Sequence, residues 1–351
     1  MSAKSVEAAE ANAAGTDDAA SATRRSRGPK SSIWARFDHA VVPYVLISPF
    51  FILFVAFGIF PIVYSALISF QSYRNEYPVN RAGTSINVFT ERWVGLENFE
   101  RTLTSFDFWQ ALFNTFGLFI LSAVPQLLLA LILASLLNRR LRAQSVFRVG
   151  ILVPYITPIV ASSIVFSTFF AKEGGQANWI LSLFHIQSTY GGNTIDGIDW
   201  RNSRWSAWLA LVIMIDWKWT GYNALLYLAA MQAIPKDVYE AAALDGAGAW
   251  RQLWSITVPM IRPMVIFTVV LSTIGSLQLF AEPVQFDTNP ASGSGGGNSH
   301  IWRTVAQLIW HTGWNQKNFG FAGAMSWVLF VVVVVVAALN GWLSNKIGGR
   351  K

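Results

Sequence analysis

The chain has 351 residues, of which 53% are hydrophobic and only 13% carry a charge. Soluble domains contain about 25% charged residues, so this composition excludes an ordinary soluble protein and indicates a membrane protein. The net charge of +7 could suggest nucleic-acid binding, but the basic residues gather beside apolar stretches, as the positive-inside rule describes. The sequence contains no cysteine, which excludes disulfides, Cys-ligated zinc and thiol catalysis within it.

The first 31 residues are rich in Ala, Ser and Asp and contain no apolar run. We expect residues 1–31 to form a disordered cytoplasmic tail. A secretory signal is the alternative, but the apolar stretch that follows is longer than a signal-peptide core. Residues 32–351 are predicted to form a single membrane domain.

Six apolar stretches are each long enough to cross the hydrocarbon core of about 30 Å as a helix. The expected fold class is therefore an all-α membrane protein with six transmembrane helices. Basic clusters precede the first span, follow the second and end the chain, which places both termini in the cytoplasm. The predicted spans cover about residues 41–70, 111–137, 149–170, 205–231, 263–280 and 321–343.

The fourth predicted span has a polar centre, with Asp216 and Lys218 among Thr, Tyr and Asn residues. A charge inside a span is a functional-site hypothesis, because it must face protein or water. Hydrogen bonding between helices explains the first of its two polar faces equally well, and plain packing explains any single aromatic residue. Helical spacing of about 100° per residue places Asp216, Thr220, Asn223 and Tyr227 on one face and Lys218 and Tyr222 on another, with Trp219 between them.

The segment 234–262 separates the fourth and fifth spans and carries charges that are costly in lipid, such as Lys236 and Glu240. It is therefore predicted to be a cytoplasmic loop. Its alanines at 241–243 favour a short helix, and Gly246 and Gly248 are typical of a helix end. The residues allow two interpretations: a tight turn between membrane helices, or a short helix that docks on another protein.

The pattern Glu240-Ala241-Ala242, then Gly246, Ile256 and Pro259 resembles the signature loop of membrane subunits of binding-protein-dependent ABC importers. The chain departs from this pattern in having Val258 where the family has Leu. The resemblance implies the type I importer permease fold, in which this loop is a coupling helix that docks in a cleft of the ATP-hydrolysing subunit. The ATPase-coupling residues that it implies are Glu240, Ala241, Ala242, Asp245, Gly246, Ile256 and Pro259.

Over about residues 40–345 the chain is similar to the larger permease subunit of maltose-type carbohydrate importers. Lys218 and Trp219 differ in type from the maltose-type residues, so the identity of the sugar stays open. Glu282 is as readily a solvated loop residue as a contact. Motifs that carry the resemblance are Pro43-Tyr44 with Pro49, the run from Trp93 to Phe99, Phe147-Arg148, Val153-Pro154-Tyr155, Gly221-Tyr222-Asn223 and the run from Gly275 to Phe280. Matching positions and sugar chemistry together give the substrate-binding residues Lys218, Trp219, Tyr222, Asn223, Gly275 and Gln278.

The chain has no phosphate-binding loop of the Gly-x4-Gly-Lys-Ser/Thr type, no catalytic motif and no metal-ligand spacing. We therefore expect no catalytic or metal site and no cofactor on this chain, with ATP and Mg bound by a partner ATPase. The expected function is a permease subunit that moves a sugar, such as a di- or oligosaccharide, into a bacterial cell by alternating access. Its expected partners are a second permease in a heterodimer, two ATP-binding subunits, an extracytoplasmic solute-binding protein and the cell membrane, without nucleic acid.

Three alternatives remain open at this stage. The first is an ABC permease for a non-sugar solute such as glycerol phosphate or polyamine. The second is a secondary transporter driven by an ion gradient, for which only Asp216 and Lys218 could serve as titratable groups on the path. The third is a membrane-embedded enzyme, which would need a cluster of catalytic groups.

Overall fold

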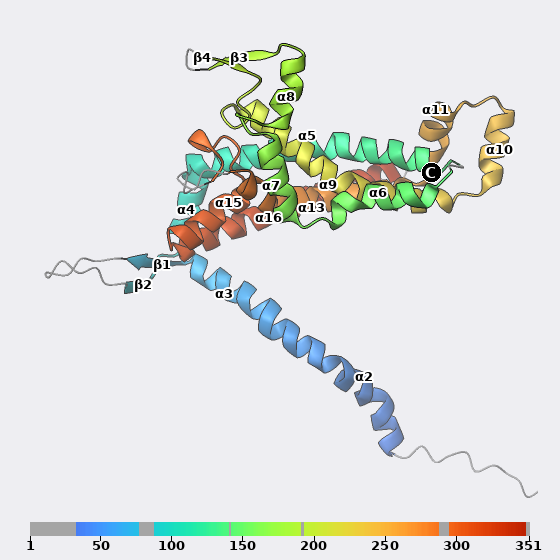
Figure 1. Cartoon of the computed structure of the whole chain (residues 1–351). Coiled ribbons are helices and arrows are strands. Elements are labelled where there is room, and N and C mark those ends of the chain that lie inside the picture. The colour runs from blue at the N-terminus through green and yellow to red at the C-terminus, as the bar shows by residue number, and fades with distance from the viewer. Residues whose placement is uncertain (1–32, 77–87, 140–141, 191–192, 288–294, 349–351) are drawn as a thin grey trace, which may run out of the picture. The chain divides into compact units, whose positions relative to one another are not determined.

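The computed structural model describes residues 33–76, 88–139, 142–190, 193–287 and 295–348 (Figure 1). The predicted tail, residues 1–31, lies outside the described residues. The chain divides into two compact units, residues 1–63 and 64–351. Helices make up most of both units, and two short hairpins accompany them in the second.

The first unit contains helix α2 (Ile33–Phe54), the π-helical turn η1 (Val55–Ile59) and the start of α3 (Phe60–Ser69). Together these elements form an apolar helical run, Val42–Ser69, that is long enough to cross a membrane. The predicted first span, 41–70, coincides with this run.

Three long helices run through the second unit, and two of them are apolar enough to span a membrane. The third, α9, has 29 residues but is less apolar than the other two, because polar residues occupy its centre. α9 packs along α5 in the most extensive helix pairing of the described residues. The three helices are α5 (Phe106–Leu137), α9 (Arg204–Gln232) and α16 (Phe319–Gly348).

The third predicted span, 149–170, is a bent pair rather than one straight helix. Helices α6 (Gln144–Ile156) and α7 (Ile159–Phe169) meet at an angle of 89°. Thr157 lies directly before Pro158, and its ψ of 131° is extended. A residue before proline is driven out of the helical region by the proline ring, so the sequence Thr157-Pro158 accounts for the bend.

The fifth predicted span, 263–280, corresponds to α13 (Arg262–Leu277), which ends earlier than predicted, with Gln278 as its C-cap. Short helical pieces precede α13, and their continuous part, Ala249–Met260, meets it at 76°. The predicted spans thus correspond to three apolar runs, two bent pairs and α9. The preceding pieces are α10 (Lys236–Leu244), α11 (Ala249–Gln252), the π-helical turn η2 (Leu253–Thr257) and α12 (Val258–Met260).

Short elements gather at the end of the second unit that lies away from α10 (Figure 1). Hydrogen bonds from Asn178 to the carbonyls of Lys172 and Ile198, at 3.0 and 2.9 Å, fix part of this region, together with the ion pair Lys172–Asp199 at 3.3 Å. The elements are the antiparallel pair β1 (Gln71–Glu76) and β2 (Val88–Trp93), α4 (Glu97–Thr104), α8 (Gln176–Leu183), the antiparallel pair β3 (Gln187–Tyr190) and β4 (Asn193–Asp196), α14 (Ala281–Phe286), η4 (Asn298–His300), α15 (Val305–Trp310) and η5 (His311–Asn315).

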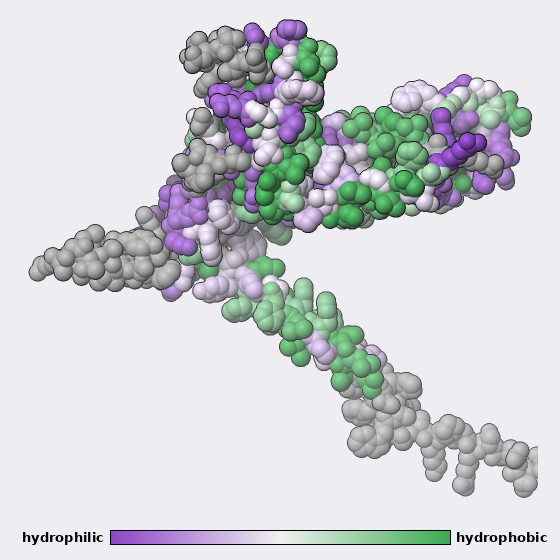
Figure 2. Space-filling model, viewed as in Figure 1, coloured by the Kyte–Doolittle hydropathy of each residue, from purple (hydrophilic) through white to green (hydrophobic). Residues whose placement is uncertain are grey.

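Hydropathy follows this arrangement. Figure 2 shows hydrophobic residues along the middle of the second unit and hydrophilic residues gathered at its two ends. Such a distribution is what a segment that crosses a lipid core requires.

We predict that Gly221→Ala destabilises the second unit, because α6 and α9 touch at this glycine. A Cβ atom at Gly221 would lie 1.7 Å from the carbonyl oxygen of Ile151, a backbone atom. Overpacking of this kind costs about 1–3 kcal/mol and should lower the thermal unfolding temperature of the purified protein. Gly150→Ala is the matched control, since a Cβ there meets nothing within 4 Å. Equal unfolding temperatures for the two variants would contradict this prediction.

Candidate solute cavity and coupling segment

A cavity of about 260 Å³ lies among α5, α6, α9 and α13. Ligand sites in proteins occupy roughly 300–1,000 Å³, so this cavity could hold a small molecule or one end of a larger one. Four of the six predicted substrate-binding residues line it: Trp219, Tyr222, Asn223 and Gly275. The full lining is Gln126, Tyr155, Ile215, Trp219, Tyr222, Asn223, Leu271, Ser272, Gly275 and Ser276.

Three aromatic rings form one wall of the cavity. Tyr155 of α6 stacks on Tyr222 of α9, with ring centroids 4.6 Å apart and planes at 17°. Tyr155 also meets Trp219 edge-on, with centroids 5.5 Å apart. Tyr155 therefore fixes the position of both α9 rings, although its side chain comes from the preceding span.

The rest of the lining is apolar or carries neutral polar groups. Gln126 and Asn223 are both 4% exposed and supply amides, while Ser272 and Ser276 supply hydroxyls from α13. Among the described residues that line the cavity, none is a carboxylate or a cation.

Two predicted substrate-binding residues do not reach the cavity. Lys218 is only 6% exposed, and its Nζ donates to the carbonyl of Thr157 at 2.7 Å, at the break between α6 and α7. Gln278 is exposed at the end of α13. Helical spacing alone could not show that the bent third span turns a backbone carbonyl toward Lys218, or that α13 ends before Gln278.

Glu282 of α14 is buried, with 4% of its surface exposed, so it is not a solvated loop residue. The Trp219 side chain hydrogen-bonds its carboxylate, and Lys218 is near enough to act on its charge. Burial raises the pKa of Glu282 above its usual value, while the Trp219 hydrogen bond and the Lys218 charge oppose that rise. Glu282 thus interacts with Trp219 of the cavity wall without lining the cavity itself.

The other polar face of α9 is used for contacts between helices at its far end. The hydroxyl groups of Tyr227 and Thr268 lie 2.6 Å apart and join α9 to α13. Asp216 is partly buried, and one of its carboxylate oxygens has no hydrogen-bond partner among the described residues.

The predicted coupling segment forms the short helix expected from its alanines. Helix α10 contains Glu240, Ala241 and Ala242, and it ends at Asp245. Gly246 follows with φ of +76°, the left-handed conformation typical of a helix stop. Ile256 lies in η2, and Pro259 lies in α12. Most of α10 is exposed, Leu244 most of all, at 91%.

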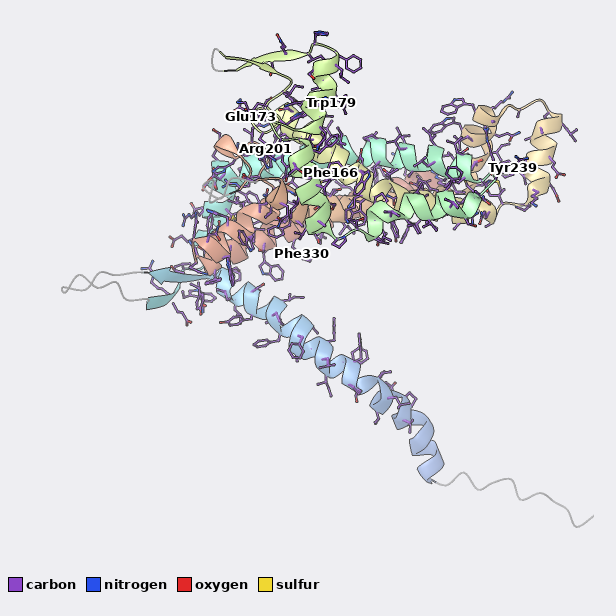
Figure 3. The ribbon with its side chains drawn as sticks, in the orientation of Figure 1. Phe166, Glu173, Trp179, Arg201, Tyr239 and Phe330 are labelled. Carbon is purple, nitrogen blue, oxygen red and sulfur yellow. The ribbon has the colours of Figure 1, made fainter. Side chains whose placement is uncertain are left out.

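A second cavity, of about 510 Å³, lies between this segment and the ends of the spans. Its lining includes Asn138, Arg139 and Gln144 from the connection between α5 and α6, as well as Lys236 and Tyr239 from α10. The basic connection and the coupling segment therefore lie at the same end of the second unit. Figure 3 labels Tyr239 at this end, whereas Glu173 and Arg201 lie at the opposite end.

Comparison with known proteins identifies the family. Residues 126–349 match the family described as binding-protein-dependent transport system inner membrane component. The chain belongs to this family. It is therefore a multi-pass membrane component of a transport system and not an enzyme.

Individual relatives agree with this assignment. The chain is 32% identical over 320 residues to a lactose transport system permease protein of Rhizobium radiobacter, covering 90% of this chain and 98% of that protein. It is 31% identical over 307 residues to an arabinooligosaccharides transport system permease protein of Halalkalibacterium halodurans, covering 87% and 88%. A chain of a bacterial alginate ABC transporter has the same fold, with a TM-score of 0.69 at 20% identity over 90% of this chain and 98% of that chain.

Sequence reasoning did not assign Gln126, Tyr155 or Glu282 to the site. Tyr155 belongs to the motif Val153-Pro154-Tyr155, but nothing in one sequence shows that the second, third and fourth spans meet at one cavity. The Thr157-Pro158 pair was the one available signal for this cavity. It predicts a break in a membrane helix, and such a break is tolerated where protein surrounds it.

We predict that Glu282→Gln and Lys218→Met each destabilise the permease by about 1–3 kcal/mol, because each leaves a buried polar partner less well satisfied. The double variant should lose less stability than the two single losses added together, with coupling of roughly 0.5–3 kcal/mol. Thermal unfolding of the four proteins measures this coupling. Glu173→Gln is the control, because Glu173 is exposed. Strict additivity would contradict a shared cluster.

Proposed function

We propose that this permease carries a neutral sugar into the cytoplasm through a pathway that includes the 260 Å³ cavity. The wall of stacked rings is the observation that carries this proposal. The C–H faces of a sugar pack on flat aromatic rings, and its hydroxyls pair with amides and hydroxyls such as those of Gln126 and Asn223. The relatives named for lactose and arabinooligosaccharide transport support the same substrate class.

The absence of charge in the described lining favours a neutral solute over the two charged alternatives. Glycerol phosphate would call for cationic partners and a polyamine for carboxylates, and the described lining contains neither. Lys218 and Glu282 do not line the cavity, and each interacts with protein groups instead. An ion-driven mechanism is also less favoured, because Asp216 does not line the cavity.

The assembly that we propose contains a second permease, two ATP-binding subunits and an extracytoplasmic solute-binding protein, with ATP and Mg held by the ATP-binding subunits. Helix α10 would dock on an ATP-binding subunit through the exposed residues Glu240, Ala241 and Asp245, while the buried Ala242, together with Gly246, Ile256 and Pro259, would shape the segment. Exposure of α10 supports this role. Both termini would lie in the cytoplasm, because the described basic residues Arg139, Arg142 and Arg148 follow α5 at the end of the unit that carries α10.

Loss of a ring from the wall should reduce sugar uptake. We predict that Trp219→Ala and Tyr222→Ala each lower lactose or arabinooligosaccharide uptake by the reconstituted transporter about tenfold, the equivalent of roughly 1.4 kcal/mol of lost contact. Trp217→Ala is the matched control, because Trp217 lies on the same helix but contacts Phe166 instead of the cavity. Equal uptake by all three variants would argue against the cavity as the sugar path.

Gly246→Asp should uncouple ATP hydrolysis from uptake while the protein still reaches the membrane. A side chain at Gly246 meets nothing within 4 Å, and the left-handed backbone costs a non-glycine residue about 1–2 kcal/mol. The control below carries the same backbone cost, so the difference between the two variants reports the bulk and charge on the proposed docking surface. Gly95→Asp is the control, since Gly95 also has positive φ, +59°, and open space around it. Membrane content and uptake per ATP are measured for both variants. Normal uptake per ATP by Gly246→Asp would exclude the coupling role of this position.

A further inference from the structure

Helix α10 contacts the rest of the unit along one side: Val238 and Tyr239 pack against the core cluster at the ends of the spans, while most of its other residues are exposed. No helix or strand of the described residues packs extensively against it, and the 510 Å³ cavity lies between it and the ends of the spans. After α10 the chain passes through Gly246 and Gly248, both in open space. Glycine backbone is conformationally free, so this connection alone would let α10 move independently of the helices that follow it.

A hydrogen bond between two side chains joins α10 to the π-helical turn η2. The hydroxyl oxygens of Tyr239, on α10, and Thr257, at the end of η2, lie 3.0 Å apart. Thr257 is 4% exposed and donates its own proton to the carbonyl of Gln252 at 3.2 Å. Tyr239 is therefore the donor to Thr257, since each hydroxyl has one proton to give.

The segment that follows Gly248, α11 and η2, is held in place by its own contacts. The Gln252 side chain donates to the carbonyl of Ala247 at 2.8 Å, and Leu253 is buried in the core cluster at the ends of the spans. Beyond η2 the chain continues through α12 into α13, which supplies Leu271, Ser272, Gly275 and Ser276 to the solute cavity. π-Helical turns such as η2 frequently occur at functional sites.

We propose that Tyr239 is a positioning residue for energy coupling. Its hydrogen bond to Thr257 fastens α10 to the end of η2, which continues through α12 into α13. A displacement of α10 is thereby passed toward the cavity wall instead of being absorbed at Gly246 and Gly248. This inference rests on the proposed docking of α10 to an ATP-binding subunit.

The chain contains a matched control for this bond. Tyr227 and Thr268 also pair through their hydroxyls, at 2.6 Å, and Thr268 likewise donates to a backbone carbonyl, that of Val265. This second pair joins α9 to α13 within the spans and does not involve α10. Tyr227→Phe and Tyr239→Phe therefore remove the same chemical group from the same kind of pair at different places.

The first experiment measures the position of α10 directly. The chain has no cysteine, so Leu244→Cys and Phe267→Cys provide two sites for spin labels on α10 and α13 in the assembled transporter. Both residues are exposed, at 91% and 49%. Tyr239→Phe should broaden the distance distribution between the labels, and Tyr227→Phe should leave it unchanged. A distribution as narrow in Tyr239→Phe as in the parent would overturn the proposal.

The second experiment measures coupling in proteoliposomes that contain the full transporter and its binding protein, with lactose and arabinooligosaccharides as probes. Tyr239→Phe and Thr257→Val should each lower uptake per ATP hydrolysed about fivefold. The double variant should be no worse than either single one, because both remove the same bond. Unchanged uptake per ATP in Tyr239→Phe, or the same loss in Tyr227→Phe, would overturn the proposal.

The two experiments separate this inference from the proposed function. A parent transporter that hydrolyses ATP but takes up neither sugar would contradict the proposed substrate class. The spin-label distances do not depend on any sugar, so they decide the role of Tyr239 in that case as well.

Discussion

The polar centre of α9 is the constraint on which the rest of the second unit depends. Lys218, Thr220 and Asn223 are no more than 8% exposed, and inside a membrane such groups must face protein or a water-filled cavity. Close approach of α6 to α9 at Gly221 provides the enclosure. The break between α6 and α7 then frees the carbonyl of Thr157, which accepts from Lys218. The bend in one span and the charge in the next are therefore satisfied by each other.

This arrangement also explains why the cavity and the coupling segment are linked. α9 and α13 form two sides of the cavity, and the chain between them is the segment that contains α10. Any displacement of α10 must therefore act on one or both of these helices. The connection from α9 to α10 is short and passes through Pro235. The connection from α10 to α13 passes through Gly246 and Gly248, and the hydrogen bond of Tyr239 to Thr257 spans it. Opening or closing of the cavity then depends on how far α13 follows α10.

Apolar length was sufficient to predict where the long helices and bent pairs lie to within a few residues, because a run of apolar side chains favours a long helix regardless of its neighbours. The short helix α10 was also predictable, since its alanines and Gly246 act locally. The bend at Pro158 and the early end of α13 were missed, and so was the direction of Lys218. These features depend on which backbone groups a neighbouring helix leaves unpaired, and one sequence does not contain that information. Tyr155, Gln126 and Glu282 were missed for the same reason, because their roles arise only when separate spans meet.

The burial of Lys218 and Glu282 behind the cavity wall bears on selectivity. An unpaired charge in a dry site is costly, and a charged wall would hold a charged solute too tightly to release it readily. Here the two charged side chains interact with protein groups, Lys218 with the Thr157 carbonyl and Glu282 with Trp219. Glu282 thereby helps to hold the Trp219 ring in place, while the described lining of the cavity stays neutral. A neutral wall with fixed aromatic faces, amides and hydroxyls is suited to moderate, reversible binding of the neutral sugar that we propose. Such binding suits a transport path, and it leaves choice among sugars to contacts made elsewhere in the assembly.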